Sequence, residues 1–435
     1  MIHRTPRLVA AAGVTALAVS AIGIGHAGAE SDGGWTVDTE DCPDPEATNA
    51  PIEGTISIGS AMPLSGPVAA AFEPVARGFE AYVNYANENE LLPGVTIEVD
   101  IQDDAYDPSL TPGVVQGLID SGVHLFAGNI GTPQNQSVVD TINEECIPHL
   151  NLQTGDPAWG EDIEEWPWTT GLLTPYHHET RGYADYIAEN YPDATVGTYF
   201  VNNDFGNVFI DAFKDAADEA GLTLGPDQSI EAGDNAPPVA QVGAFADEAP
   251  GVIVGVPLGV QCATFLAEIA NAKAENPDWE PVVIMTNTCA SPLILGLAGD
   301  AANGVLSSAA MGLVDVLDPA NAELEPVAAY LAEMEAQGLT DIITTGGAGW
   351  NTAEVTVAIL IRASESEAGL TQASIIEAAR SLDFHPTLVR ENLGNYVMNG
   401  ADDTYYSEDI QIVQYDVAAG HFTDIGEPYS YETSA

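Results

Sequence analysis

Hydrophobic positions follow two alternating periods along most of the chain. Ile56 and Ile58 alternate with polar residues as in a half-buried strand, whereas Val75 and Phe79 begin the three-to-four-residue period of a helix face. Pro74 suits a first helical turn, so we expect the break between strand and helix to span residues 63–73. This break contains a Ser-Gly turn before a helix N-terminus, where free amides can hold a carboxylate.

The same strand-then-helix arrangement recurs twice downstream. A first series predicts strands at 55–60, 96–101, 123–127 and 149–152, with helices at 74–89, 112–121 and 135–144. A second series predicts strands at 195–201, 222–230, 252–256, 282–286 and 305–309, with helices at 177–190, 208–220, 261–274 and 292–299. Helical stretches at 324–337, 350–364 and 376–382 precede a strand-like end at 410–415. Such alternation predicts parallel sheets covered on both faces, with a lobe boundary near 168–174.

The N-terminus has the pattern of an export signal. Arg4 and Arg7 precede an apolar run at 8–25, and Ala27-Gly28-Ala29 supplies a small-residue cleavage site. We expect a signal peptide at 1–29, cleaved after Ala29, and a secreted or extracytoplasmic protein in the periplasm or at the cell surface. An acidic leader at 30–51 should have little structure beyond Cys42.

The charge of the chain excludes some classes of partner. The 435 residues include 66 acidic and nine basic residues, a formal net charge of −57. Such a surface repels nucleic acid and anionic lipid. Solvation in concentrated salt is the simplest explanation, since salt screens the repulsion between the acidic side chains.

The four cysteines are Cys42, Cys146, Cys262 and Cys289. Export permits disulfides. Cys262 and Cys289 each follow a predicted strand, and neighbouring parallel strands bring such ends together. This favours a Cys262–Cys289 bond and leaves Cys42 with Cys146, although the sequence alone allows three pairings. No two cysteines have metal-ligand spacing, so we expect no metal site.

Two runs resemble a known family. Pro-Leu-Ser-Gly-Pro-Val-Ala at 63–69 and Asp-Asp-Ala-Tyr-Asp-Pro at 103–108 resemble the amino-terminal lobe of type I solute-binding proteins, in particular the leucine/isoleucine/valine-binding group of ABC importers. The resemblance extends from about Thr55 to Tyr415. It implies an α/β fold with two doubly wound parallel-sheet lobes joined by three crossovers. Lobe 1 would comprise 52–172 with 306–403, and lobe 2 would comprise 173–305 with 404–435.

Ligands of open parallel sheets bind beyond the carboxyl ends of the strands, where we expect four turns. These contain Ser65, Gly131 with Thr132, Thr154 with Gly155, and Phe205. The resemblance implies that Thr132, Thr154 and Gly155 meet a ligand carboxylate or ammonium. It also implies that Asp234 neutralises an α-ammonium. The threonines can instead be ordinary helix N-caps, and Asp234 can be a solvated loop carboxylate.

Departures from the family pattern concern the shape of the pocket. Phe205 replaces a tyrosine and cannot donate a hydrogen bond, Phe72 stands beside the position of another aromatic residue, and Trp350 replaces a tyrosine. These changes predict a more aromatic pocket and put branched-chain amino acids in doubt, unless Trp350 is a core residue.

These observations favour a binding protein over an enzyme. Neither a Gly-x-Ser-x-Gly elbow nor a phosphate-binding Gly-Lys loop occurs, and no cofactor is expected. We expect a monomer that captures an amino acid or a related small carboxylate or amide by hinge closure and delivers it to an ABC transporter permease. The alternative is a ligand-sensing protein that reports to a membrane receptor.

Overall fold

The computed structural model describes residues 34–431. The expected signal peptide and its cleavage after Ala29 lie outside the described residues. By its internal contacts the chain divides into Met1–Gly34 and Trp35–Ala435, and the fold below is that of the second unit.

A five-stranded parallel sheet is built from the first part of the chain. Its strand order is β2-β1-β3-β4-β5. The strands are β1 (Gly54–Met62), β2 (Val95–Asp103), β3 (Leu125–Ala127), β4 (His149–Leu152) and β5 (Thr169–Gly171). The connecting helices are α2 (Ala69–Glu88), α3 (Thr111–Ser121), α4 (Thr132–Gln136), α5 (Val139–Glu144) and α6 (Ala158–Glu161).

A seven-stranded sheet follows, in the order β15-β14-β10-β9-β8-β6-β7. Its parallel strands are β6 (Thr195–Asn202), β7 (Thr223–Glu231), β8 (Val252–Val256), β9 (Val282–Met285) and β10 (Leu306–Ser308). β14 (Ile412–Asp416) and β15 (His421–Asp424) add an antiparallel edge. The helices are α7 (Tyr176–Asn190), α8 (Asp204–Glu219), α9 (Val239–Glu248), α10 (Val260–Glu275) and α11 (Pro292–Gly296).

Helices cover both faces of the five-stranded sheet. On one face Ile58 packs in a cluster with Phe79 of α2, and on the other Phe126 packs in a cluster with Leu118 of α3. The opposed burial follows from the two-residue period of the strands, because successive side chains point to opposite faces. The doubly wound α/β architecture expected from the sequence is therefore confirmed.

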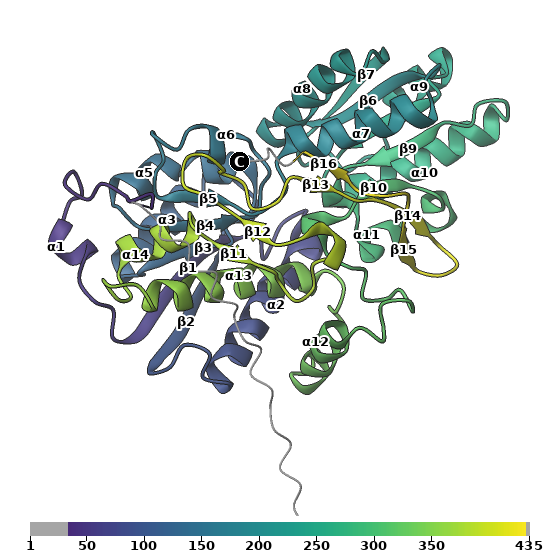
Figure 1. The fold of residues 1–435 in the computed structure, drawn as a ribbon. Helices are drawn as coiled ribbons and strands as arrows, with labels where there is room; N and C mark the ends of the chain where they lie inside the picture. The colour runs from purple at the N-terminus through teal and green to yellow at the C-terminus, as the bar shows by residue number, and fades with distance from the viewer. Residues whose placement is uncertain (1–33, 432–435) are drawn as a thin grey trace, which may run out of the picture. The chain divides into compact units, whose positions relative to one another are not determined.

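The chain passes between the two sheets three times (Figure 1). It leaves the first sheet after β5, returns after β10, and reaches the second sheet again at β14. The returning segment contains α12 (Glu325–Ala336), α13 (Gly346–Ser364) and α14 (Gln372–Ala379). Small two-stranded sheets join β11 (Asp383–Phe384) to β12 (Tyr396–Val397) and β13 (Asp409–Ile410) to β16 (Tyr429–Ser430). The expected division placed residues 306–403 in lobe 1, but β10 belongs to the second sheet. We therefore propose the same two lobes with the second passage after Ser308.

Glycines allow α2 and α13 to approach closely, side by side in Figure 1. A Cβ added at Gly349 would lie 1.8 Å from the carbonyl oxygen of Val75, and one at Gly78 would lie 2.0 Å from that of Gly346. Only glycine fits at these points, so the helices pack backbone to backbone. This contact places the N-terminal end of α13 beside the carboxyl ends of the first sheet.

Several element boundaries differ from those expected from the sequence. α2 begins at Ala69, so Pro74 lies inside the helix rather than in its first turn. α13 begins at Gly346, and residues 204–206 form the first turn of α8 rather than a separate turn. The expected helix at 135–144 is two helices, α4 and α5. α2, α8 and α13 each begin in a stretch of mostly small or polar residues, where the spacing of apolar side chains does not indicate a helix.

The two disulfides are those that the strand positions favoured. Cys262 is bonded to Cys289, and Cys42 is bonded to Cys146 across 104 residues of sequence. Within its described part, residues 34–51, the acidic leader contains one short helix, α1 (Pro45–Thr48), and is otherwise irregular. Its Trp35 ring lies under the guanidinium of Arg380, 4.9 Å from the ring centroid. The leader is thus fastened by a covalent bond and a cation–π contact.

Candidate functional site: a cavity at the strand ends

Loops that follow the carboxyl ends of the strands in both sheets line a cavity of about 190 Å³. Tyr106 follows β2 and Thr132 follows β3, whereas Phe205 follows β6 and Asn287 follows β9. Residues 309–316, after β10, and residues near the start of α13 complete the wall. Parallel sheets end in such crevices because their connecting loops diverge to opposite faces. Two sheets therefore contribute to one small site.

Three hydroxyl groups form a cluster where the loops after β3 and β4 meet the start of α7. Thr132 Oγ1 lies 2.7 Å from Thr154 Oγ1, and Tyr176 OH lies 3.4 Å from each of them. Burial raises the pKa of Tyr176 to about 12, so its phenol stays protonated at neutral pH. The two 3.4 Å contacts are long for O–H···O hydrogen bonds, which leaves hydroxyl protons available to an oxygen of a ligand.

Aromatic rings form much of the remaining wall. The Phe72 and Tyr106 rings are nearly parallel, with centroids 6.1 Å apart, and Phe205 meets Tyr176 edge to face at 5.5 Å. Such rings offer apolar surface to flat or branched groups of a ligand.

Four of the residues expected at a ligand site line the cavity: Phe72, Gly131, Thr132 and Phe205. Gly131 has a φ of +103°, and a Cβ there would lie 2.1 Å from Gln134 Oε1. The position therefore requires glycine, and the backbone forms the wall at this point.

The other five lie outside the lining. Thr154 is buried behind Thr132, and the Gly155 carbonyl accepts a hydrogen bond from the Tyr176 amide. Ser65 is exposed, with its amide bonded to Asp103 Oδ1 at 3.1 Å. Asp234 is exposed and accepts from the Ala236 amide. Trp350 packs edge to face against Tyr82 in the core, as its alternative interpretation held.

The part of the wall that follows β9 and β10 contains residues that the sequence did not bring forward. Asn287 and Ser308 line it, and both donate hydrogen bonds to the carboxylate of Glu179 on α7. Tyr183 OH donates to the same carboxylate at 2.5 Å. Burial raises the pKa of Glu179, and these hydrogen bonds oppose the shift. A glutamate in an amphipathic helix is normally expected at the surface, so the hydrophobic period does not indicate that Glu179 is buried.

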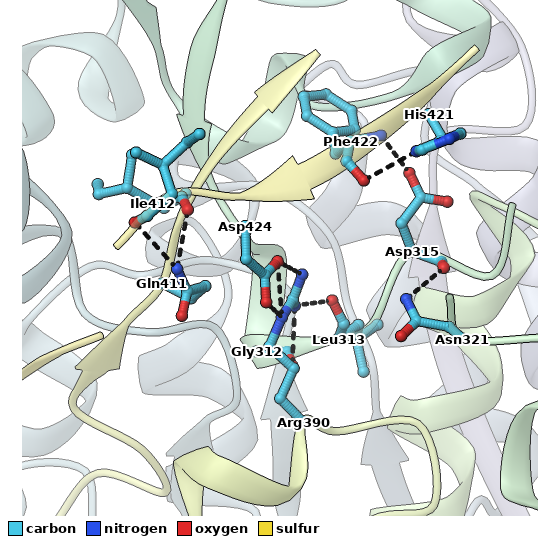
Figure 2. Close-up of polar contacts among 12 residues, drawn as sticks. Gly312, Leu313, Asp315, Asn321, Arg390, Gln411, Ile412, His421, Phe422 and Asp424 are labelled. Atoms are coloured by element: carbon cyan, nitrogen blue, oxygen red, sulfur yellow. Dashed lines mark hydrogen bonds and ion pairs between the residues drawn. The ribbon is translucent and has the colours of Figure 1, made fainter. Parts of the chain in front are cut away.

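The charged groups of the lining are held by the protein itself. Arg390 forms a two-pronged ion pair with Asp424 of β15, with Nη2 2.7 Å from Oδ1 and Nε 3.0 Å from Oδ2, and donates to the carbonyls of Gly312 and Leu313 (Figure 2). Asp315 accepts from the Phe422 amide at 2.8 Å, which Figure 2 also shows. The guanidinium is therefore committed to Asp424, and the hydroxyl cluster is the better place for a ligand carboxylate.

Within 34–431, no three His, Cys, Asp or Glu side chains are grouped so that they could hold a metal ion. The helices of the same region are all too short or too polar to span a membrane.

Comparison with known proteins gives a consistent result. The family model described as "Periplasmic binding protein" matches residues 55–420. A curated relative, the Leu/Ile/Val-binding protein homolog 3 of Brucella melitensis, is 26% identical over 185 residues, which cover 41% of this chain and 48% of the relative. The match thus spans about half the length of that relative.

Two solved structures share the fold. A branched-chain amino acid ABC transporter protein from Thermus thermophilus with bound valine superposes with a TM-score of 0.75 at 20% identity, covering 87% of this chain and 97% of that chain. A fatty acid ABC transporter substrate-binding protein from Thermomonospora curvata gives a TM-score of 0.73 at 17% identity, covering 87% and 93%. The resemblance found in the turns of the first sheet is confirmed: the chain belongs to the periplasmic binding protein family, whose members bind solutes and are not enzymes.

Proposed function

We propose that this chain is the extracytoplasmic solute-binding component of an ABC importer. It captures an amino acid or a related small carboxylate or amide in the cavity and delivers it to a transporter permease. The observation that carries the proposal is a small cavity lined by loops of two sheets, with the hydroxyls of Thr132 and Tyr176 gathered in one part of an aromatic wall.

Capture needs no chemical step. A ligand that touches the walls of both sheets binds the closed arrangement better than an open one, so closure about the three crossovers is a shift of population. We propose that the protein acts as a monomer after removal of residues 1–29. Sequencing the N-terminus of the exported protein tests the cleavage after Ala29.

The ligand class follows from the polar groups of the cavity. The Brucella relative is named for leucine, isoleucine and valine, and the two structural neighbours are named for branched-chain amino acids and fatty acids. All of these molecules carry a carboxyl group. A carboxylate oxygen is a suitable acceptor for the hydroxyl cluster, while the aromatic wall accommodates an apolar remainder.

A thermal-shift screen of the purified mature chain tests this proposal. The panel comprises amino acids, their des-amino carboxylates, their amides and aromatic acids. We expect at least one compound with a carboxyl or carboxamide group to raise the unfolding midpoint, because a ligand that binds only the folded state stabilises it. A panel without any such compound above the buffer control, at millimolar concentration, contradicts the proposal.

A further inference from the structure

Glu179 is a fully buried carboxylate behind the cavity wall formed by Asn287 and Ser308. Its relative exposure is 0%, and its oxygens accept from Asn287 N at 2.9 Å, Asn287 Nδ2 at 2.7 Å and Ser308 Oγ at 2.9 Å. Tyr183 OH supplies a fourth hydrogen bond. These four donors are all neutral groups, so hydrogen bonds rather than an ion pair hold the Glu179 carboxyl group in place.

These hydrogen bonds fix the polarity of the wall. Asn287 Nδ2 donates to Glu179 Oε2 at 2.7 Å, so the NH₂ end of the Asn287 side chain faces Glu179. The carbonyl Oδ1 is then the end of the Asn287 amide that is not engaged by Glu179. Ser308 likewise directs its hydroxyl proton toward Glu179, which leaves oxygen lone pairs on the other side. Both cavity-lining side chains are thus held in the orientation in which they accept.

We propose that Glu179 is a positioning residue that makes Asn287 Oδ1 the acceptor for an N–H or O–H group of the ligand. The inference rests on the proposed function and specifies its substrate class: a small molecule with an oxygen acceptor for the hydroxyl cluster of Thr132 and Tyr176 and a hydrogen-bond donor, such as an ammonium or amide, for Asn287. An amide oxygen accepts from the N–H of either an ammonium or an amide, so Asn287 Oδ1 suits both kinds of donor. Asp234, expected in this role from the resemblance, lies outside the cavity.

Replacing Glu179 by glutamine reverses this arrangement without changing its shape. The new carboxamide can donate to Asn287 Oδ1, so the Asn287 amide can turn and present its NH₂ to the cavity. The hydrogen-bond donor of a ligand then faces the NH₂ group of Asn287, which cannot accept a hydrogen bond. A purely structural role of Glu179 would weaken the binding of all ligands alike, whereas the positioning role weakens the binding of donor-bearing ligands selectively.

The test uses matched pairs of probes: L-leucine with 4-methylpentanoate, and L-phenylalanine with 3-phenylpropanoate. Affinities are measured by isothermal titration calorimetry for the wild type, Glu179→Gln and Asn287→Ala. We expect both variants to bind the amino-bearing member of a pair at least about tenfold more weakly and the des-amino member within about threefold of the wild type. Asn287→Ala keeps Glu179 and its hydrogen bonds from Asn287 N, Ser308 and Tyr183, and it tests the acceptor directly if Glu179→Gln fails to fold.

Glu354→Gln is the matched control. Glu354 is also a buried glutamate held by neutral donors, Thr387 N and Oγ1, but it lies outside the cavity lining. We expect this variant to change neither affinity. Equal losses for both members of a pair, or no loss in either variant, overturn the positioning role while leaving the proposed function intact. A wild type that binds neither member of either pair and no other compound of the thermal-shift panel overturns the proposed function, and this inference with it.

Discussion

Thr132 and Tyr176 present the hydroxyl protons that are best placed for a ligand oxygen. Thr132→Val and Tyr176→Phe each remove one hydroxyl and keep the size of the side chain. We expect each to weaken the binding of a carboxylate ligand by about 1–3 kcal/mol, the usual contribution of a hydrogen bond to a charged group. Titration calorimetry with the compound found in the screen measures this change.

The methyl ester of the same compound serves as the internal control for the hydroxyl variants. An ester lacks the negative charge, so its affinity should fall less than that of the carboxylate when a hydroxyl is removed. Unchanged carboxylate affinity in both variants would place the carboxylate elsewhere in the cavity.

Glu354 provides a prediction about stability. Burial raises the pKa of this α13 carboxyl to about 7 in the folded protein, with the hydrogen bonds from Thr387 acting in the opposite direction. A raised pKa favours the protonated form on folding. The stabilisation is therefore complete below the unfolded-state pKa, near 4.5, and is lost as the pH rises through about 7.

Glu354→Gln should remove this dependence, because glutamine remains neutral. Between pH 5 and pH 8 we expect the unfolding free energy of the variant to rise relative to the wild type by an amount on the order of 2–3 kcal/mol. Urea unfolding at both pH values measures it. Glu335→Gln, on an exposed position of α12, is the control and should follow the wild type. Parallel profiles for Glu354→Gln and the wild type would contradict the raised pKa.

At the scale of elements, the sequence predicts strands better than helix starts. β1, β4, β8 and β9 lie within two residues of their expected bounds. β-Branched residues mark β1, β8 and β9, whereas β4 is marked by the alternation of Leu150 and Leu152 with polar residues. α2 and α13 begin earlier than expected. Ala69 and Gly346 start stretches of small residues, in which large apolar and polar side chains do not alternate with a helical period. Tertiary contact forms these turns: the glycines of α13 are helical where they meet α2.

The site was predictable only in part, for a related reason. The turn residues Gly131 and Thr132 could be found because they lie between a predicted strand and a predicted helix. The distance between Glu179 and Asn287 depends on how α7 packs across β9 and β10, which a periodic pattern does not encode. Such contacts across more than 100 residues need the folded chain.

The ion pair between Arg390 and Asp424 links the segment after α14 to β15, at the third passage between the sheets (Figure 2). The Arg390 side chain is 7% exposed. Asp424→Ala leaves this guanidinium without its carboxylate, so we expect a loss of unfolding free energy of about 1–3 kcal/mol. Denaturant unfolding measures the loss.

Glu280→Ala is the control for the ion-pair variant. It removes the carboxylate partner of Lys273, where the side chains are 35% and 72% exposed. We expect a change below about 1 kcal/mol, because exposed pairs contribute little. Equal effects of the two variants would show that the ion pair between Arg390 and Asp424 contributes no more to stability than an exposed pair.

At the scale of the whole molecule, the acidic side chains cannot be neutralised from within. Beyond residue 29 the chain has seven Lys and Arg residues against 66 acidic residues. Arg77, Lys214, Lys273 and Arg390 form ion pairs, whereas Arg181 and Arg380 stack on aromatic rings. Seven cations can neutralise only a small part of this negative charge, and the net repulsion among the carboxylates opposes the compact state.

Salt should relieve this repulsion. The Debye length falls from about 10 Å at 0.1 M to about 3 Å at 1 M, so added KCl screens carboxylates that are several ångströms apart. We expect the unfolding midpoint, measured by differential scanning calorimetry at pH 7.5, to rise from low salt to molar KCl. Sorbitol at matched osmolality separates charge screening from exclusion of a cosolute, because sorbitol carries no charge. If the midpoint stays flat or falls in KCl, or rises equally in sorbitol, the acidic surface does not limit stability at low salt, and its excess charge must have another cause.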